Sequence, residues 1–140
     1  MKLLVGVDGS EYALKATKKA VGLVRESGGE LILLSVAPDI TSLGVWEIGH
    51  GESLLRDIEA KAREAIDKAQ EVLKAEGVEA KASLIKTGAP ADEIIRVAEE
   101  EGVDMIVMGS RGLTGHPHYL LGSVAHKVVT YAPCSVLVVK

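Results

Sequence analysis

The sequence has no Asn and no Phe, one Cys and one Gln among 140 residues, and no long apolar run. Cys134 cannot form an internal disulfide by itself, so nothing in the sequence indicates an oxidising compartment. Charged residues or glycines interrupt every apolar run well short of the roughly 18 residues that a membrane-spanning helix needs. The apolar start at 1–5 is too short for a signal peptide because Asp8 ends it. We therefore expect a cytoplasmic protein without a membrane segment.

Aromatic residues make up only 3% of the sequence. The core must therefore be aliphatic, and we do not expect the aromatic platforms on which single-stranded nucleic acid stacks. Sixteen Lys and Arg against twenty Asp and Glu give a net charge of -4. This balance disfavours a nucleic-acid binder, because such proteins need a basic face. It is compatible with a small anionic ligand, which needs only a local site.

Amide side chains are even scarcer than aromatic ones, with Gln70 the single Gln and no Asn, whereas Glu and Lys are plentiful. Depletion of thermolabile amides combined with Lys and Glu enrichment is a bias of proteins from hot environments. This composition predicts a thermophilic source.

Short apolar runs alternate along the chain with helical patterns. The length, with 47% apolar and 26% charged residues, fits one globular domain over 1–140. Nearly continuous apolar runs are typical of buried strands, which we expect at 3–7, 31–36, 105–108 and 136–139, and the partial alternation at 79–86 predicts a strand nearer a sheet edge. Capping and periodicity predict helices from Ser10 to about Ser27, over 55–73, from Pro90 to Gly102, and from Ser123 to before Pro133. The alternation predicts an α/β fold, a five-stranded parallel sheet with four helices on its two faces.

The least ordinary residues follow two of these strands, Asp8 after the first and Gly109 after the fourth. In an open α/β sheet, ligands bind beyond the strand ends where the strand order reverses, which for an order 3-2-1-4-5 lies between strands 1 and 4. Glycines allow close backbone approach, and free amides at a helix start attract anions. On these residues alone, two interpretations stay open: a phosphate site at Gly109, Gly112, Gly122 and Ser123, or an ordinary loop with a Ser N-cap.

Two familiar phosphate motifs are missing from the sequence. There is no G-x-x-x-x-G-K-[ST], which excludes a P-loop NTPase. No G-x-G-x-x-G follows the first strand either, which disfavours dinucleotide binding. Instead, Gly109, two residues, Gly112, nine residues and Gly122-Ser123 match the G-x2-G-x9-G-[ST] motif of ATP-binding universal stress proteins. Val7–Ser10 resembles the opening of that family and Ala132–Cys134 its close, so the resemblance covers the whole chain.

The resemblance implies a Rossmann-like three-layer α/β/α fold with strand order 3-2-1-4-5, and ATP near the switch point of strands 1 and 4. It also implies Mg²⁺ or Mn²⁺ held by the phosphates, and a homodimer. Carried over by position, Asp8 contacts the ribose, the Val36 backbone meets the adenine edge, and Gly109 lies against the ribose. A side chain at Gly122 is expected to occupy phosphate space. The phosphate-holding residues are Gly112, Gly122, Ser123 and Val124. The full expected binding set is Asp8, Val36, Met108, Gly109, Arg111, Gly112, Gly122, Ser123 and Val124.

We expect neither a catalytic site nor a dedicated metal site. His116 and His118 could bind a metal, but no third ligand is evident in the sequence. Two interpretations stay open for Arg111 and Lys127, which either neutralise phosphate or lie on the solvated surface.

Three further residues invite a functional interpretation. Trp46 either covers the adenine or packs on a partner. His126 is expected on the surface or at an interface. Cys134 is expected to be structural rather than nucleophilic.

The leading hypothesis is an ATP-binding regulatory or stress-response protein that acts through nucleotide occupancy and association, with an unidentified downstream protein partner. The alternatives are a nucleotide hydrolase or nucleotidyl transferase of the same fold class, and an interaction module without a ligand. No P-loop Lys or arginine finger is identifiable, so hydrolysis is expected to be slow. The apolar strand at 136–139 is expected at a sheet edge, where pairing with a second copy gives a homodimer.

Overall fold

The computed structural model describes residues 1–40, 49, 51–112 and 120–140. Trp46, His116 and His118 lie outside the described residues, so the interpretations placed on them stay predictions. The strands are β1 (Lys2–Gly6), β2 (Glu30–Ala37), β3 (Ala82–Thr87), β4 (Met105–Gly109) and β5 (Ser135–Val139). The helices are α1 (Glu11–Ser27), α2 (Gly51–Ala75), α3 (Pro90–Glu101) and α4 (Ser123–Tyr131).

The five strands form one parallel sheet in the order β3-β2-β1-β4-β5, which confirms the predicted fold class and strand order. β1 lies at the centre, with Leu4 opposite Ile32 of β2 and Ile106 of β4. Side chains of these central strands are almost wholly inaccessible to solvent because helices cover both faces. β3 and β5 form the two edges.

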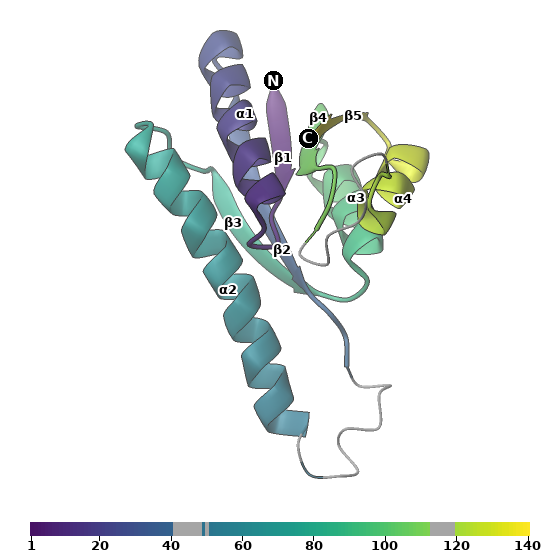
Figure 1. The fold of residues 1–140 in the computed structure, drawn as a ribbon. Helices are drawn as coiled ribbons and strands as arrows, with labels where there is room; N and C mark the ends of the chain where they lie inside the picture. The colour runs from purple at the N-terminus through teal and green to yellow at the C-terminus, as the bar shows by residue number, and fades with distance from the viewer. Residues whose placement is uncertain (41–48, 50, 113–119) are drawn as a thin grey trace.

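Two aliphatic cores lie on opposite faces of the sheet. Because side chains alternate along a strand, Leu3 and Val5 of β1 pack against α1 and α2, whereas Leu4 packs against α3 and α4. Figure 1 shows this arrangement, with α1 and α2 on one side of the sheet and α3 and α4 on the other. Helices on both faces leave the strand ends as the place where polar backbone and side-chain groups meet.

The predicted helix boundaries follow from local capping. α1 begins after Ser10, whose Oγ accepts a hydrogen bond from the Ala13 amide at 3.1 Å, and it ends at Gly28 in the left-handed region with φ of 68°. α3 begins at Pro90, as predicted, and ends at Glu101, with the predicted Gly102 as its C-cap. α4 begins at Ser123 but its N-cap is Gly122, without a side-chain cap bond. The Ser N-cap interpretation of this helix is therefore wrong.

Apart from Gly51 at its start, the long helix α2 has buried residues only along its later turns. The predicted inner residues Ala62, Ala65, Ala69 and Leu73 are buried, whereas Leu55, Ile58 and Val72 are only half-buried. Figure 1 shows why: the amino-terminal turns of α2 extend beyond the end of the sheet. Within the described residues, no helix is long and apolar enough to cross a membrane.

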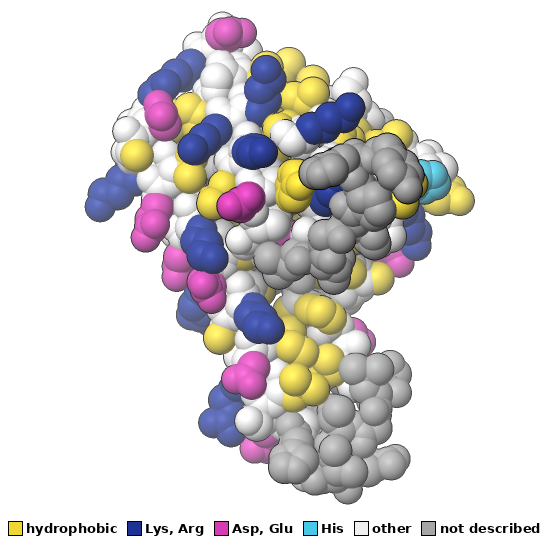
Figure 2. Space-filling view, viewed as in Figure 1, with side chains coloured by type: hydrophobic (Ala, Val, Ile, Leu, Met, Phe, Trp, Pro, Cys, Tyr) yellow, Lys and Arg dark blue, Asp and Glu magenta, His cyan; other side chains and the backbone are white. Residues whose placement is uncertain are grey.

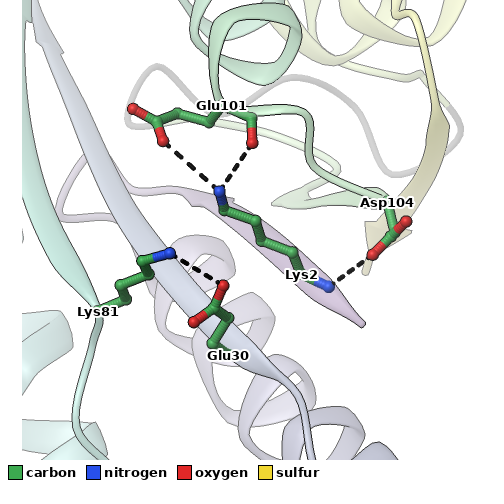
Figure 3. Close-up of polar contacts among 5 residues, drawn as sticks. All are labelled: Lys2, Glu30, Lys81, Glu101 and Asp104. Atoms are coloured by element: carbon green, nitrogen blue, oxygen red, sulfur yellow. Dashed lines mark hydrogen bonds and ion pairs between the residues drawn. The ribbon is translucent and has the colours of Figure 1, made fainter.

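Polar contacts join neighbouring strands at the amino end of the sheet (Figure 3). The Lys2 amide donates to Asp104 Oδ2 at 2.7 Å, and Lys2 Nζ donates to the Glu101 carbonyl at 2.8 Å. Lys81 Nζ pairs with Glu30 Oε1 at 3.2 Å. Exposed ion pairs of this kind contribute about 0–1 kcal/mol each, so they add little to the stability of the fold.

Candidate functional site

A cavity of about 180 Å³ opens at the carboxyl ends of β1 and β4. The chain leaves β1 towards α1 on one face and leaves β4 towards α4 on the other, so the strand order reverses between them, as predicted. The structure brings all nine expected binding residues to the wall of this one cavity: Asp8, Val36, Met108, Gly109, Arg111, Gly112, Gly122, Ser123 and Val124.

Asp8 occupies the turn between β1 and α1. Its Oδ1 accepts a hydrogen bond from the Ser10 amide at 2.9 Å, which fixes the carboxylate at the start of the helix. Its Oδ2 lies against Gly112, where an added Cβ would approach within 3.0 Å of this oxygen. Gly112 therefore leaves room for the carboxylate beside the cavity, and any larger residue there would push Asp8 aside.

The backbone of Val36 points into the space where β1 has ended. Leu34 O accepts from the Val7 amide at 2.9 Å on the β1 side. Ala37 O accepts from the Gly88 amide at 2.9 Å on the β3 side. Because backbone groups alternate between the two sides of a strand, the N–H and C=O of Val36 point the same way as those of Leu34. They reach past the last residue of β1, towards the cavity.

The motif glycines are needed partly for packing within the protein. The Gly122 amide donates to Ser110 O at 2.7 Å, and a Cβ on Gly122 would lie 3.2 Å from that oxygen and 3.4 Å from Arg111 Cα. A Cβ on Gly109 would lie 2.6 Å from Tyr12 Cβ. An added Cβ on Gly122 would face the backbone of residues 110–112, so a side chain there would first crowd the protein's own chain; its entry into phosphate space stays a prediction.

The start of α4 supplies backbone donors to the cavity. Its first amides, those of Ser123 and Val124, have no partner within the helix, and the helix dipole places partial positive charge there. Ser123 is exposed and Val124 is half-buried. This arrangement suits an anion, and no side chain caps it.

Ser110, which was not among the residues expected from the sequence, lines the same cavity. Its side chain is only 3% exposed, and its Oγ has no hydrogen-bond partner among the described residues. A buried hydroxyl without a partner costs free energy, so its presence indicates a ligand or water group within reach. The sequence feature that could have identified Ser110 as a cavity residue is its position between the motif glycines Gly109 and Gly112. Also missed was an apolar wall formed by Leu34, Pro90 and Ile94, which come from different elements.

The two candidate cations differ in environment. Arg111 is 9% exposed, so its interpretation as a solvated surface residue is wrong; its Nη1 donates to Tyr12 Oη at 2.8 Å. Lys127 is about half-exposed and pairs with Asp92 Oδ1 at 2.7 Å, away from the cavity-lining residues. The hydrogen bond from Lys127 and the charge of Asp92 raise the pKa of this ammonium group.

His126 and Cys134 also lie outside the set of cavity-lining residues. His126 is exposed on α4. Cys134 is half-buried, and burial raises the pKa of its thiol. Among the described residues, no three His, Cys, Asp or Glu side chains gather as a metal site.

Positive and negative side chains are interspersed on the surface in Figure 2. Lys and Arg alternate with Asp and Glu over the described part of this face, so it carries no continuous basic groove of the kind that tracks a nucleic-acid backbone.

Comparisons with known proteins agree with this fold and site. The model of the universal stress protein family matches residues 1–140. The universal stress protein YxiE of Bacillus subtilis is 34% identical over 146 aligned residues, which cover 99% of this chain and 98% of YxiE. The solved structure of universal stress protein UspA from Lactobacillus plantarum is 30% identical, has a TM-score of 0.82, and is matched over 100% of this chain and 97% of its own. A universal stress protein solved in complex with cAMP is 27% identical, with a TM-score of 0.76 and coverage of 100% and 97%. The chain belongs to the universal stress protein family.

Proposed function

We propose that this protein binds ATP in the cavity at the ends of β1 and β4 and acts through nucleotide occupancy and association rather than turnover. One observation carries the proposal. A carboxylate from Asp8, an unpartnered buried hydroxyl from Ser110, and the free amides of α4 line a single cavity at the switch point of the sheet. These are the donors and acceptors that a nucleoside phosphate requires.

The adenosine half has suitable partners on one side of the cavity. The Val36 N–H and C=O suit the donor and acceptor pattern of an adenine edge, and the apolar wall that includes Ile94 suits a purine face. Asp8 Oδ2 can accept hydrogen bonds from ribose hydroxyls, because Oδ1 already holds the turn. The universal stress protein solved with cAMP shows that a relative of the same fold binds an adenine nucleotide.

The phosphate half has suitable partners on the other side. The amides of Ser123 and Val124, together with the dipole of α4, favour phosphate oxygens, and Gly112 allows the chain to approach them. A divalent ion such as Mg²⁺ or Mn²⁺ would be held by the phosphates themselves.

We expect slow ATP hydrolysis because the two candidate cationic side chains, Arg111 and Lys127, already have partners within the protein. Arg111 Nη1 is hydrogen-bonded to Tyr12 and Lys127 is paired with Asp92, whereas phosphoryl transfer needs positive charge on the γ-phosphate and an oriented water. The hydrolase alternative requires turnover faster than about 1 s⁻¹, the low end of typical enzyme values.

The edge strand β5 supports association of two copies. Val139 O accepts a hydrogen bond from the Ser110 amide at 2.8 Å, so Val139 points its backbone groups inward to the sheet. By alternation, the N–H and C=O of Val138 point to the open edge. Paired antiparallel with its copy, β5 would lose this exposed edge in a closed two-fold dimer.

The test is direct measurement of bound and added nucleotide. Mass spectrometry of the purified, denatured protein should find ATP or another adenine nucleotide in it, and calorimetric titration with Mg²⁺ should show saturable ATP binding. A protein that releases no nucleotide and gives no heat with ATP at millimolar concentration refutes the proposal. Steady turnover above about 1 s⁻¹ would favour the hydrolase alternative.

A further inference from the structure

Tyr12, in the first turn of α1, contacts two residues of the chain that leaves β4. Its Cβ and backbone pack so closely on Gly109 that only glycine fits there. Its ring lies beneath the Arg111 guanidinium, with Arg111 Cζ 5.0 Å from the ring centroid. Its hydroxyl accepts a hydrogen bond from Arg111 Nη1 at 2.8 Å. Tyr12 is not itself among the described residues that line the cavity.

The alternation of side chains along β4 explains these contacts. Val107 belongs to the core beneath α1, whereas Ile106 and Met108 belong to the core beneath α3 and α4. Gly109 follows Val107 on the α1 side, and the Arg111 side chain lies on that side as well, against Tyr12. Helix α4 packs through Ala125 and Val128 on the opposite face of the sheet, whereas the Arg111 guanidinium stacks on Tyr12 of α1.

We propose that Tyr12 and Arg111 form an anchor that positions residues 109–112 beside Asp8, and that Arg111 serves the nucleotide site through this position and not as a phosphate ligand. The inference rests on the proposed nucleotide binding. Tyr12 follows Ser10 by two residues, and the Ser10 amide donates the hydrogen bond that holds Asp8. The anchor therefore joins the two halves of the site, the turn after β1 and the turn after β4.

The physical basis is preorganisation. Gly112 lies against Asp8 Oδ2, so a shift of residues 109–112 changes the space in which a ribose would meet that carboxylate. A hydrogen bond from a guanidinium to a hydroxyl, reinforced by stacking on the ring, holds this arrangement before the ligand arrives. Loss of the anchor should therefore weaken binding of the nucleoside itself, whatever the number of phosphates.

The test is a double-mutant cycle of Tyr12→Phe and Arg111→Gln, with calorimetric affinities for adenosine, AMP and ATP. In each single variant the affinities for adenosine, AMP and ATP should all fall by one common factor, about three- to tenfold. The double variant should lose little more than Arg111→Gln alone, because one contact is removed twice. If the two substitutions damaged the structure independently, their losses of binding free energy would instead add in the double variant. Far-ultraviolet circular dichroism checks that each variant folds.

Lys15→Gln is the matched control. Lys15 Nζ also lies over the Tyr12 ring, 5.4 Å from its centroid, but Lys15 is exposed. This variant should bind all three ligands like the parent.

Five outcomes overturn the inference. Loss confined to AMP and ATP in Arg111→Gln would make the guanidinium a phosphate ligand. Unchanged affinity in Tyr12→Phe, fully additive losses, or an equal loss in Lys15→Gln would remove the anchor while leaving the proposed nucleotide binding intact. If the parent itself binds none of the three ligands, the proposed function is wrong and the inference falls with it.

Discussion

Replacing Gly109 with Ala should destabilise the protein, although it adds a single methyl group. The new Cβ would lie 2.6 Å from Tyr12 Cβ and 2.9 Å from the Tyr12 carbonyl carbon. That is about 1 Å inside the 3.5–4.0 Å separation at which carbon atoms attract each other. Because Tyr12 meets the methyl with its backbone as well as its Cβ, a change of rotamer cannot relieve the contact, and α1 must move away from β4. Overpacking of this kind costs about 1–3 kcal/mol.

The assay is urea unfolding followed by circular dichroism, with Gly22→Ala as the control. Gly22 is exposed in the middle of α1, and an added Cβ there would meet no atom within 4 Å. Alanine should stabilise the helix at this position by up to about 1 kcal/mol. The two Gly→Ala changes should therefore shift the unfolding midpoint in opposite directions. If Gly109→Ala were as stable as the parent, the close packing on Tyr12 would not explain this glycine. Gly109 would then serve only to let a ligand approach the backbone.

Four further predictions follow from the site and the edge of the sheet. Asp8→Ala should weaken adenosine and ATP by the same factor, more than about tenfold for loss of hydrogen bonds to a charged group; an effect on ATP alone would contradict the ribose assignment. Val138→Pro removes an amide that points to the open edge of β5, so light scattering should show a dimer for the parent and a monomer for the variant. The same mass for the parent and the variant would argue against β5 as the interface. Burial raises the pKa of the Cys134 thiol, so iodoacetamide should modify the folded protein more slowly at pH 8 than the urea-unfolded chain, and equal rates would contradict this environment. The scarcity of amide side chains predicts a calorimetric midpoint above about 65 °C, and a midpoint within 45–65 °C would contradict a thermophilic source.

The fold was predictable because its signals are local. The run at 31–36 is almost wholly buried in β2, and Ser10 caps α1 as its residue type suggests. The start of β3 was less predictable: the pairing with β2 begins at Ala82 rather than at 79, where the apolar and polar residues already alternate. Periodicity alone does not tell where a neighbouring strand is available.

The site was predictable in its membership but not in its internal contacts. The glycine spacing and the strand ends led to the nine residues that line the cavity. The bond between Arg111 and Tyr12 joins residues 99 positions apart, and no local pattern signals it. The same holds for the apolar wall, to which Pro90 and Ile94 of α3 contribute only through tertiary packing. The close approach of Gly122 to Ser110 likewise gives the glycine a packing reason that the motif does not reveal.

The central claim is that an adenine nucleotide binds between the ends of β1 and β4. Amide chemical shifts measured during an ATP titration of the isotopically labelled protein test it most directly. The account predicts saturable shifts at Asp8, Gly112, Ser123 and Val124, with the amides around Lys81 at the opposite end of the sheet unchanged. Saturable shifts confined to any other part of the molecule, or none at millimolar ATP, would contradict it.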